Sequence, residues 1–248
     1  MVGKPSGSTA IMLKTEVPSL EEPHRIADEG IQVDEVSAPS PVAARSRLDY
    51  VSLVVHLVFI LSGVSALIYQ LVWQRSLMMI YGTNVESVAM VVAAFMLGLG
   101  LGSVAGGAVS KSQKMPLVLL FSGAELLIGV YGIFSLRLFH WLGGYTLQAG
   151  TLETGLLAFG LVFLPTLLMG ATLPLLVGWR VNTTGHVGRS VSGLYFVNTL
   201  GASLGAFAGV FGFLHNSGLS GSVKAAALLN IVAAGSILAV WALQRRQS

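Results

Sequence analysis

Six runs of about twenty apolar residues fill the sequence from residue 50 onwards, and they constrain its fold more than any other feature. An α-helix needs a run of this length to cross the hydrocarbon core of a lipid bilayer. The runs are residues 50–71, 87–109, 115–136, 156–177, 191–213 and 225–243. We therefore expect an all-α integral membrane protein whose residues 50–248 form one six-helix transmembrane domain in the lipid bilayer. The connections between the runs are too short to hold a soluble domain.

Residues 1–49 have a different composition from the rest of the chain. They hold eight of the eleven acidic residues, together with scattered proline and serine. They contain no apolar core followed by a small-residue cleavage site, so the segment does not read as a signal peptide. Low hydrophobicity predicts a disordered cytoplasmic tail, and an arm that docks onto a partner is the functional alternative.

The basic residues near the expected membrane ends predict an orientation. With the amino terminus inside, eight of them fall on the cytoplasmic side and three outside. The cytoplasmic set is Arg45, Arg47, Lys111, Lys114, Arg180, Arg189, Arg245 and Arg246, and the outer set is Arg75, Arg137 and Lys224. This bias predicts that both termini are cytoplasmic. It also accounts for the basic excess, so no aromatic-studded basic patch remains to bind nucleic acid.

The fourth run contains the segment FLPTLLMGATLPLL, residues 163–176, which is interrupted by Pro165, Gly170 and Pro174. Each proline removes a backbone donor and clashes with the carbonyl four residues earlier. The freed groups then need partners in protein or in a wet cavity, because lipid offers none. We therefore expect a broken helix, of the kind that borders binding sites in transporters, with Thr172 as a further candidate contact. The alternative is a kink that neighbouring helices tolerate.

Two ladders of glycines at four-residue spacing lie in the second and fifth runs. They are Gly98, Gly102 and Gly106, and Gly201, Gly205 and Gly209. Such ladders let helix backbones approach closely, so we expect both helices to be central and tightly packed. Asn198 lies on the seam of the second ladder and should reach a neighbouring helix, most simply through a structural hydrogen bond.

The spacing of these features also predicts an internal repeat. The two ladders are 103 residues apart, and a similar distance separates Gly63 from Gly170. A repeat of three helices has an odd number of crossings, so its second copy is inverted in the membrane. This is the 3+3 arrangement of each half of a major-facilitator transporter.

Glu125 lies about ten residues from either end of the third run, and hence near the bilayer midplane. An ionisable residue there costs roughly 2.5–3.5 kcal/mol on insertion scales and is a functional candidate. We expect it to face the bundle interior near the fourth run, with Ser122 and Gly129 on its own face. It either binds a cation or a proton, or is a neutral structural group bonded to a neighbour such as Asn198 or Thr172.

The first run, residues 50–71, and the residues that follow it contain several aromatic and polar side chains. His56, Gly63 and Gln70 recur at intervals of seven and share one helical face, whereas Tyr69 and Trp73 form a second aligned pair. Tyr69 and Gln70 are therefore candidate solute contacts. Trp73 at this depth reads as an interfacial belt residue, and the nearby Arg75 as a side chain that snorkels to the surface.

Five segments together resemble one known family. They are SGVSALIYQLVWQR at 62–75, the glycine ladder after FML at 95–97, AELLIGVYG at 124–132, LPTLLMGATLPLL at 164–176 and YFVNTLGASLGAFAG at 195–209. Their order and spacing are similar to the membrane region of the bacterial membrane-bound spermidine synthase-like proteins, also described as fused major-facilitator and spermidine synthase proteins. The resemblance covers most of residues 50–243 and implies a bacterial inner membrane.

The family commonly carries a cytoplasmic aminopropyltransferase-like domain after its last membrane helix. The present sequence holds no strand followed by a glycine-rich nucleotide loop and a downstream acid, so the family's catalytic residues have no positions here and no cofactor is expected. The segment FLHNSG at 213–218 also departs from the proline-containing apolar turn that the resemblance implies.

A catalytic function has little support in the residues themselves. The five histidines are isolated, there is no cysteine, and no base lies near Glu125 in the sequence. One interpretation is an accessory or transporter-like membrane protein that handles a small cationic, polyamine-like solute. The alternative is a non-transporting anchor or assembly subunit for a separately encoded synthase-like enzyme or another membrane complex. Six helices are half of a major-facilitator bundle, so we expect a homo-oligomer or a partner protein.

Overall fold

The computed structural model describes residues 41–81, 85–111, 116–145, 150–185 and 187–246, which belong to one helical unit. Residues 1–40 of the expected disordered tail lie outside the described residues. Residues 41–49 were assigned to the same tail by sequence, but their backbone is helical.

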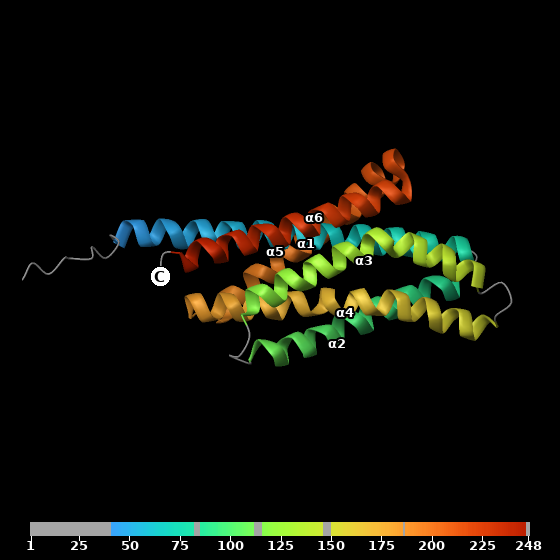
Figure 1. Ribbon diagram of the computed structural model, residues 1–248, viewed down its shortest axis with the longest axis horizontal. Coiled ribbons are helices and arrows are strands. Elements are labelled where there is room, and N and C mark those ends of the chain that lie inside the picture. The colour runs from blue at the N-terminus through green and yellow to red at the C-terminus, as the bar shows by residue number, and fades with distance from the viewer. Residues whose placement is uncertain (1–40, 82–84, 112–115, 146–149, 186, 247–248) are drawn as a thin grey trace, which may run out of the picture. The chain divides into compact units, whose positions relative to one another are not determined.

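Every regular element in this part of the chain is a helix (Figure 1). The elements in order are α1 (Pro41–Tyr81), α2 (Val85–Ser110), α3 (Leu117–Tyr145), α4 (Thr151–Thr184), α5 (Val187–Ala208), the π-helix η2 (Gly209–Leu214) and α6 (His215–Arg245). The long apolar runs account for this content, because in lipid a helix satisfies its backbone groups within its own segment.

Helix α1 is much longer than the expected span of residues 50–71. Its 41 residues rise about 60 Å at about 1.5 Å per residue, which is twice the roughly 30 Å of a hydrocarbon core. It begins with Pro41, and proline suits the first helical position because the N–H that it lacks has no helical acceptor there. At the other end it runs ten residues beyond Leu71, and one face of this extension, including Val72, Trp73 and Leu77, is buried.

Five helical stretches in the described residues are long and apolar enough to cross a bilayer. The last of them, Ser190–Arg245, has 56 residues and contains both η2 and Gly218. Gly218 adopts φ 62° and ψ −168°, a backbone conformation outside the helical region that favours glycine. Beyond it, α6 packs against α3 and α1, and Figure 1 shows α6 running back beside them.

The prediction of a broken helix at residues 163–176 is wrong. Helix α4 is continuous from Thr151 to Thr184, with Pro165 and Pro174 inside it. Pro165 lacks the N–H that would bond to Leu161, and the Tyr131 hydroxyl of α3 donates to that carbonyl oxygen instead, at 2.6 Å. The alternative of a proline tolerated by its neighbours therefore applies at this position.

The glycine ladders lie at helix contacts, as expected. A Cβ added to Gly102 would meet the Leu167 carbonyl of α4, and one added to Gly205 would meet the Val64 carbonyl of α1. The two ladder helices are not central, however. Helix α2 packs chiefly against α4 and α5 chiefly against α1, so each lies at the side of the bundle. A ladder of glycines indicates that a helix has one close neighbour. It does not indicate that the helix is surrounded by others.

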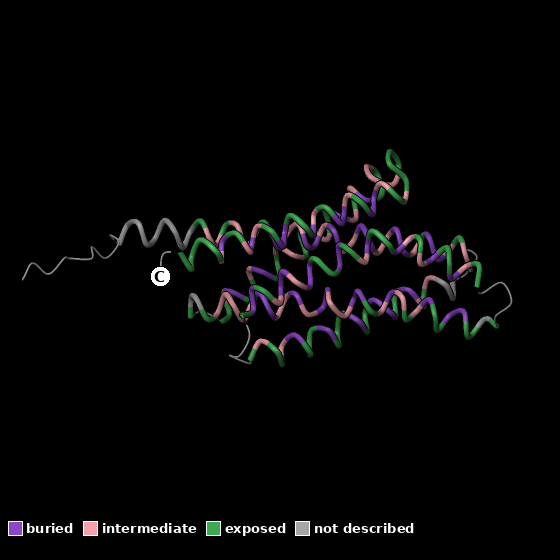
Figure 2. The backbone as a smooth tube through the Cα atoms, viewed as in Figure 1, coloured by how far each residue is buried: buried purple, intermediate pink, exposed green. Residues whose placement is uncertain are grey.

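Buried residues follow the faces where helices meet, and exposed residues face outwards (Figure 2). Many of the exposed side chains are large and apolar, among them Met96, Phe134, Phe196, Phe207 and Phe211. An outer surface of this kind suits lipid rather than water. These features describe a multi-pass helical membrane protein.

Candidate functional site

A layer of polar residues divides the apolar core into two clusters. It consists of Ser62 on α1, Glu125 on α3, Thr172 on α4 and Asn230 on α6, all of them buried. On α3, Phe121 of one cluster precedes Glu125 and Ile128 of the other follows it. The other three helices cross the layer in the same way, each with apolar cluster residues on both sides. Four helices therefore place their polar residues at one level of the bundle.

Glu125 is fully buried in this layer. Its carboxyl group accepts hydrogen bonds from the Ser62 hydroxyl at 2.6 Å and from the Asn230 side-chain amide at 2.9 Å. It faces the bundle interior as expected, but Asn198 and Thr172, the suggested partners, are not the groups that bind it. On the same helix face, the Ser122 hydroxyl donates to the Ala234 carbonyl of α6 at 3.4 Å.

A cavity of about 110 Å³ adjoins the polar layer. Its polar lining comprises Ser62, Ser65, Thr172, Asn198 and Asn230, and its apolar lining includes Phe59, Leu99, Ile128 and Met169. Ser62 and Asn230 belong to this lining and also hold Glu125. They therefore connect the buried acid to the cavity.

The hydroxyl groups around the cavity have their hydrogens engaged in other bonds. Ser62 donates to Glu125, Ser65 donates to the Ser62 carbonyl at 2.9 Å, and Thr172 donates to the Met169 carbonyl at 2.7 Å. The Asn230 amide donates to Glu125, while its Oδ1 is buried with no hydrogen-bond partner among the described residues. Besides the amide N–H groups of Asn198 and Asn230, the groups left to meet an occupant are oxygen lone pairs, which suit a cation or a hydrogen-bond donor.

Trp73 and Tyr69 are core residues, so the prediction of an interfacial Trp73 is wrong. Trp73 is fully buried and donates from Nε1 to the Ser135 hydroxyl at 2.9 Å. Its ring stacks on Tyr69 with centroids 5.0 Å apart and also meets Phe95 and Phe139. The sequence predicted a helix that ends near Leu71, whereas α1 continues and its buried side chains extend as far as Leu77.

The remaining candidates from the sequence do not line this cavity. Tyr69 packs against Gly132, and Gln70 is half-buried. Gly170 approaches the backbone of Leu99, and Pro174 lies beside Gly106. Pro165 is buried within α4. In this structure the glycines and prolines of the fourth run lie at helix contacts. Of the candidate residues named from the sequence in that segment, only Thr172 lines the cavity, together with Asn198 of α5.

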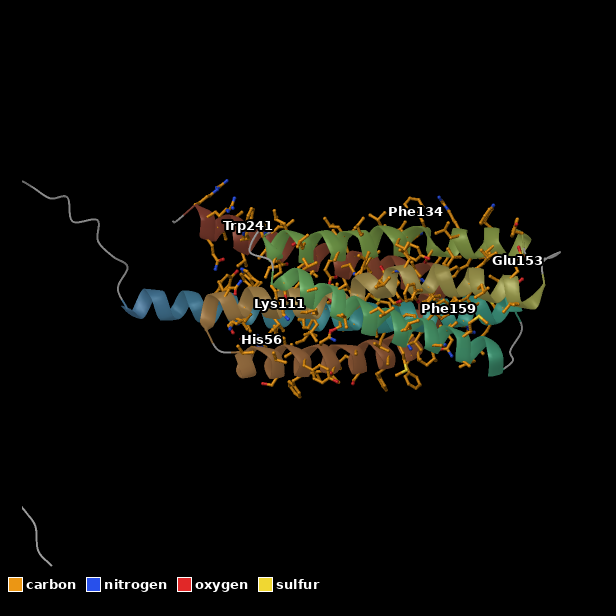
Figure 3. All side chains as sticks on the ribbon, turned by 90° about the horizontal axis from the view of Figure 1, so that it is seen from below. His56, Lys111, Phe134, Glu153, Phe159 and Trp241 are labelled. Carbon is orange, nitrogen blue, oxygen red and sulfur yellow. The ribbon has the colours of Figure 1, made fainter. Side chains whose placement is uncertain are left out.

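Glu125 is the one buried charged residue in the part of the chain that the structure describes. Within the same residues no group of three or more His, Asp or Glu side chains could hold a metal ion. Side chains such as His56, Lys111 and Trp241 lie towards one end of the bundle, and Glu153 lies at the other (Figure 3). The polar layer is thus separate from the charged ends of the helices.

Sequence reasoning did not assign Ser62, Ser65 or Asn230 to the site. A polar residue within each apolar run was the available signal, and Asn230 is a clear example. The rotation of each helix, which decides which of these residues meet Glu125, depends on packing between helices.

The comparisons with known proteins supply no relative for this site. No protein-family model, no curated protein and no solved structure matches the chain.

Proposed function

We propose that the chain is a transporter-like membrane protein that binds a small cation, a primary ammonium group, at the polar layer around Glu125. The observation that carries this proposal is the fully buried acid held by Ser62 and Asn230 beside a cavity that presents oxygen lone pairs. A carboxylate has about four acceptor sites, and two hydrogen bonds leave capacity for a further donor. An ammonium group supplies three such donors and a compensating charge.

The size of the cavity limits the occupant. Its volume of about 110 Å³ is well below the roughly 300–1,000 Å³ of pockets that enclose drug-sized ligands. Methylammonium or one end of a polyamine is therefore a better match than an entire long polyamine. The resemblance implies a polyamine-like solute, and the size of the cavity restricts the bound part of such a solute to its terminal amine.

The experiment measures the melting temperature of the purified protein in detergent against increasing methylammonium or putrescine. A ligand that binds only the folded state stabilises it by about 2.7 kcal/mol at a hundred times its Kd. We expect a dose-dependent increase for the wild type and none for Glu125→Gln, which keeps the shape but removes the charge. Glu153→Gln is the matched control, because Glu153 is an exposed acid in the first turn of α4.

Two results would contradict the proposal. Equal stabilisation of Glu125→Gln and the wild type would show that the amine binds elsewhere. Equal stabilisation by sodium chloride would show a general cation effect rather than an ammonium site.

The proposal includes a membrane architecture of six crossings in a bacterial inner membrane, with both termini cytoplasmic. The six helices would form an inverted 3+3 repeat, related to the family named above.

Support for the repeat comes from paired contacts. Gly98, Gly102 and Gly106 of α2 meet Phe163, Leu167 and Ala171 of α4, and Gly201, Gly205 and Gly209 of α5 meet Ile60, Val64 and Ile68 of α1. Adding 103 to each α2 number and subtracting 103 from each α4 number converts the first set of pairs into the second. One offset thus relates two helix contacts residue by residue.

A second candidate function is a membrane anchor or assembly subunit for a separate enzyme or membrane complex. The length of α1 favours it, because about 30 Å of this helix exceeds what a hydrocarbon core requires. Such an extension gives a partner a rigid surface outside the bilayer. Copurification from native membranes distinguishes the two functions, because a stoichiometric second protein supports the anchor, whereas a pure homo-oligomer that amines stabilise supports transport.

A further inference from the structure

A second hollow lies far from the polar layer, at the end of α1 that faces η2 and the start of α6. Its volume is about 770 Å³. Gln74, Arg75 and His215 form its polar lining, and Leu71, Met78, Met79, Val210 and Leu214 form its apolar lining. We call this hollow the Arg75 groove.

The depth of the groove matches the level of lipid headgroups. The apolar stretch of α1 runs from Tyr50 to Ile80, so its middle lies near Ser65. Arg75 is ten residues further on, or about 15 Å along the helix axis at about 1.5 Å per residue. Half of a hydrocarbon core is also about 15 Å, so a bilayer centred on this stretch would have the boundary between acyl chains and headgroups level with Arg75.

The charge of the groove is positive. Arg75 is exposed, and neither of the two acidic side chains that the structure describes, Glu125 and Glu153, lines the groove. A guanidinium group offers a planar fork of donors that suits a phosphate, and Gln74 and His215 can supply further N–H donors beside it.

The rest of the wall is apolar and adaptable. Met78 and Met79 contribute flexible thioether chains, and Leu71 and Val210 extend the surface towards the bundle. The combination of a cationic head region and an apolar wall at one membrane boundary fits a phospholipid, and it does not fit a small soluble anion, which has no apolar part to bury.

We infer that the Arg75 groove binds an anionic phospholipid, with the lipid phosphate on Arg75 and an acyl chain along Met78 and Met79. The site is independent of the amine site at Glu125, because the two hollows share no lining residue. Basic pockets between transmembrane helices on the cytoplasmic side bind lipid headgroups, and the same chemistry applies at the outer side, where the predicted topology places Arg75.

The test titrates delipidated protein in detergent with short-chain phosphatidylglycerol, phosphatidylcholine or soluble glycerol 3-phosphate, and follows bound lipid by native mass spectrometry and the melting temperature. We expect phosphatidylglycerol to bind and stabilise the wild type in preference to the other two. Arg75→Gln should weaken its apparent affinity about tenfold, the loss expected for charge-assisted hydrogen bonds to phosphate. Arg75→Lys should restore part of that loss because it restores the charge.

Arg137→Gln is the matched control, since Arg137 is an exposed arginine on α3 that does not line the groove, and it should bind like the wild type. Equal affinity of Arg75→Gln and Arg137→Gln for phosphatidylglycerol would overturn the inference. So would equal binding of glycerol 3-phosphate, because the apolar wall would then contribute nothing.

Discussion

Asn230 holds together the two halves of the candidate site. Its amide nitrogen donates to Glu125, and its Oδ1 is buried without a partner among the described residues. A buried acceptor left in this state is costly in an apolar bundle, and a donor bound in the adjoining cavity would relieve that cost. Asn230 therefore matters to both interpretations of Glu125, because it donates a structural hydrogen bond to the acid and also offers an acceptor to a bound donor.

Replacing Asn230 tests the hydrogen bonds of the polar layer. We expect Asn230→Leu to lower the free energy of unfolding by about 1–3 kcal/mol, because the Glu125 carboxyl loses a buried donor. The combined variant Asn230→Leu with Glu125→Leu should be less destabilised than the sum of the two single changes, since both partners are then apolar. Denaturation of the four proteins in detergent measures this coupling, and strict additivity would mean that the two side chains do not interact.

Tyr131 and Pro165 permit a sharper test of one residue pair. The Tyr131 hydroxyl occupies the carbonyl of Leu161 that Pro165 leaves without a helical donor. We expect Tyr131→Phe to cost about 1–2 kcal/mol in the wild type. In a Pro165→Ala background the same change should cost much less, because the introduced alanine would supply its own backbone N–H to the Leu161 carbonyl. An equal cost in both backgrounds would show that Tyr131 stabilises the protein in another way.

At the level of helices, the glycine seams decide which pairs pack closely. We expect Gly102→Leu and Gly205→Leu each to destabilise the protein by about 1–3 kcal/mol or more, because the new side chain meets backbone that cannot move aside. Gly100→Leu is the control within α2, since a Cβ there meets nothing within 4 Å. Melting temperatures of the purified variants report the difference, and equal effects at Gly100 and Gly102 would contradict the contact assigned to α2 and α4.

The sequence predicted the helices well because apolar length is a local property. It predicted a chain of long apolar helices, but it ended the first one near Leu71 and mistook Trp73 for a belt residue, because the face of α1 that other helices cover is set by packing. It also predicted a break at Pro165, because the compensating Tyr131 lies on another helix. The same limit applies to the site, where the buried acid was evident while its partners Ser62 and Asn230 depend on how four helices are rotated.

At the scale of the whole helical unit, two helix pairs carry the closest packing. Helices α2 and α4 form one pair and α5 and α1 the other, while α3 and α6 pack against each other between them. Glu125 and Asn230 lie on that last pair, where the two proposed repeats meet. A binding site at a repeat interface is the arrangement found in many transporters, and the site proposed at Glu125 would have that position.

The number of membrane crossings gives the last prediction. The stretch Ser190–Arg245 would cross once as a single helix, but we propose that the non-helical Gly218 and the packing of α6 against α3 divide it into two crossings, which makes six in total. Six crossings place both ends on one side, and five place them on opposite sides. The chain has no cysteine, so single cysteines at Ser8, Ser217 and Ser248 can be labelled without background. We expect an impermeant thiol reagent applied outside intact cells to label Ser217→Cys and to leave Ser8→Cys and Ser248→Cys unlabelled until the cells are lysed. Labelling of Ser248→Cys but not Ser8→Cys from outside would mean an odd number of crossings. That result would contradict the proposed inverted repeat of three helices.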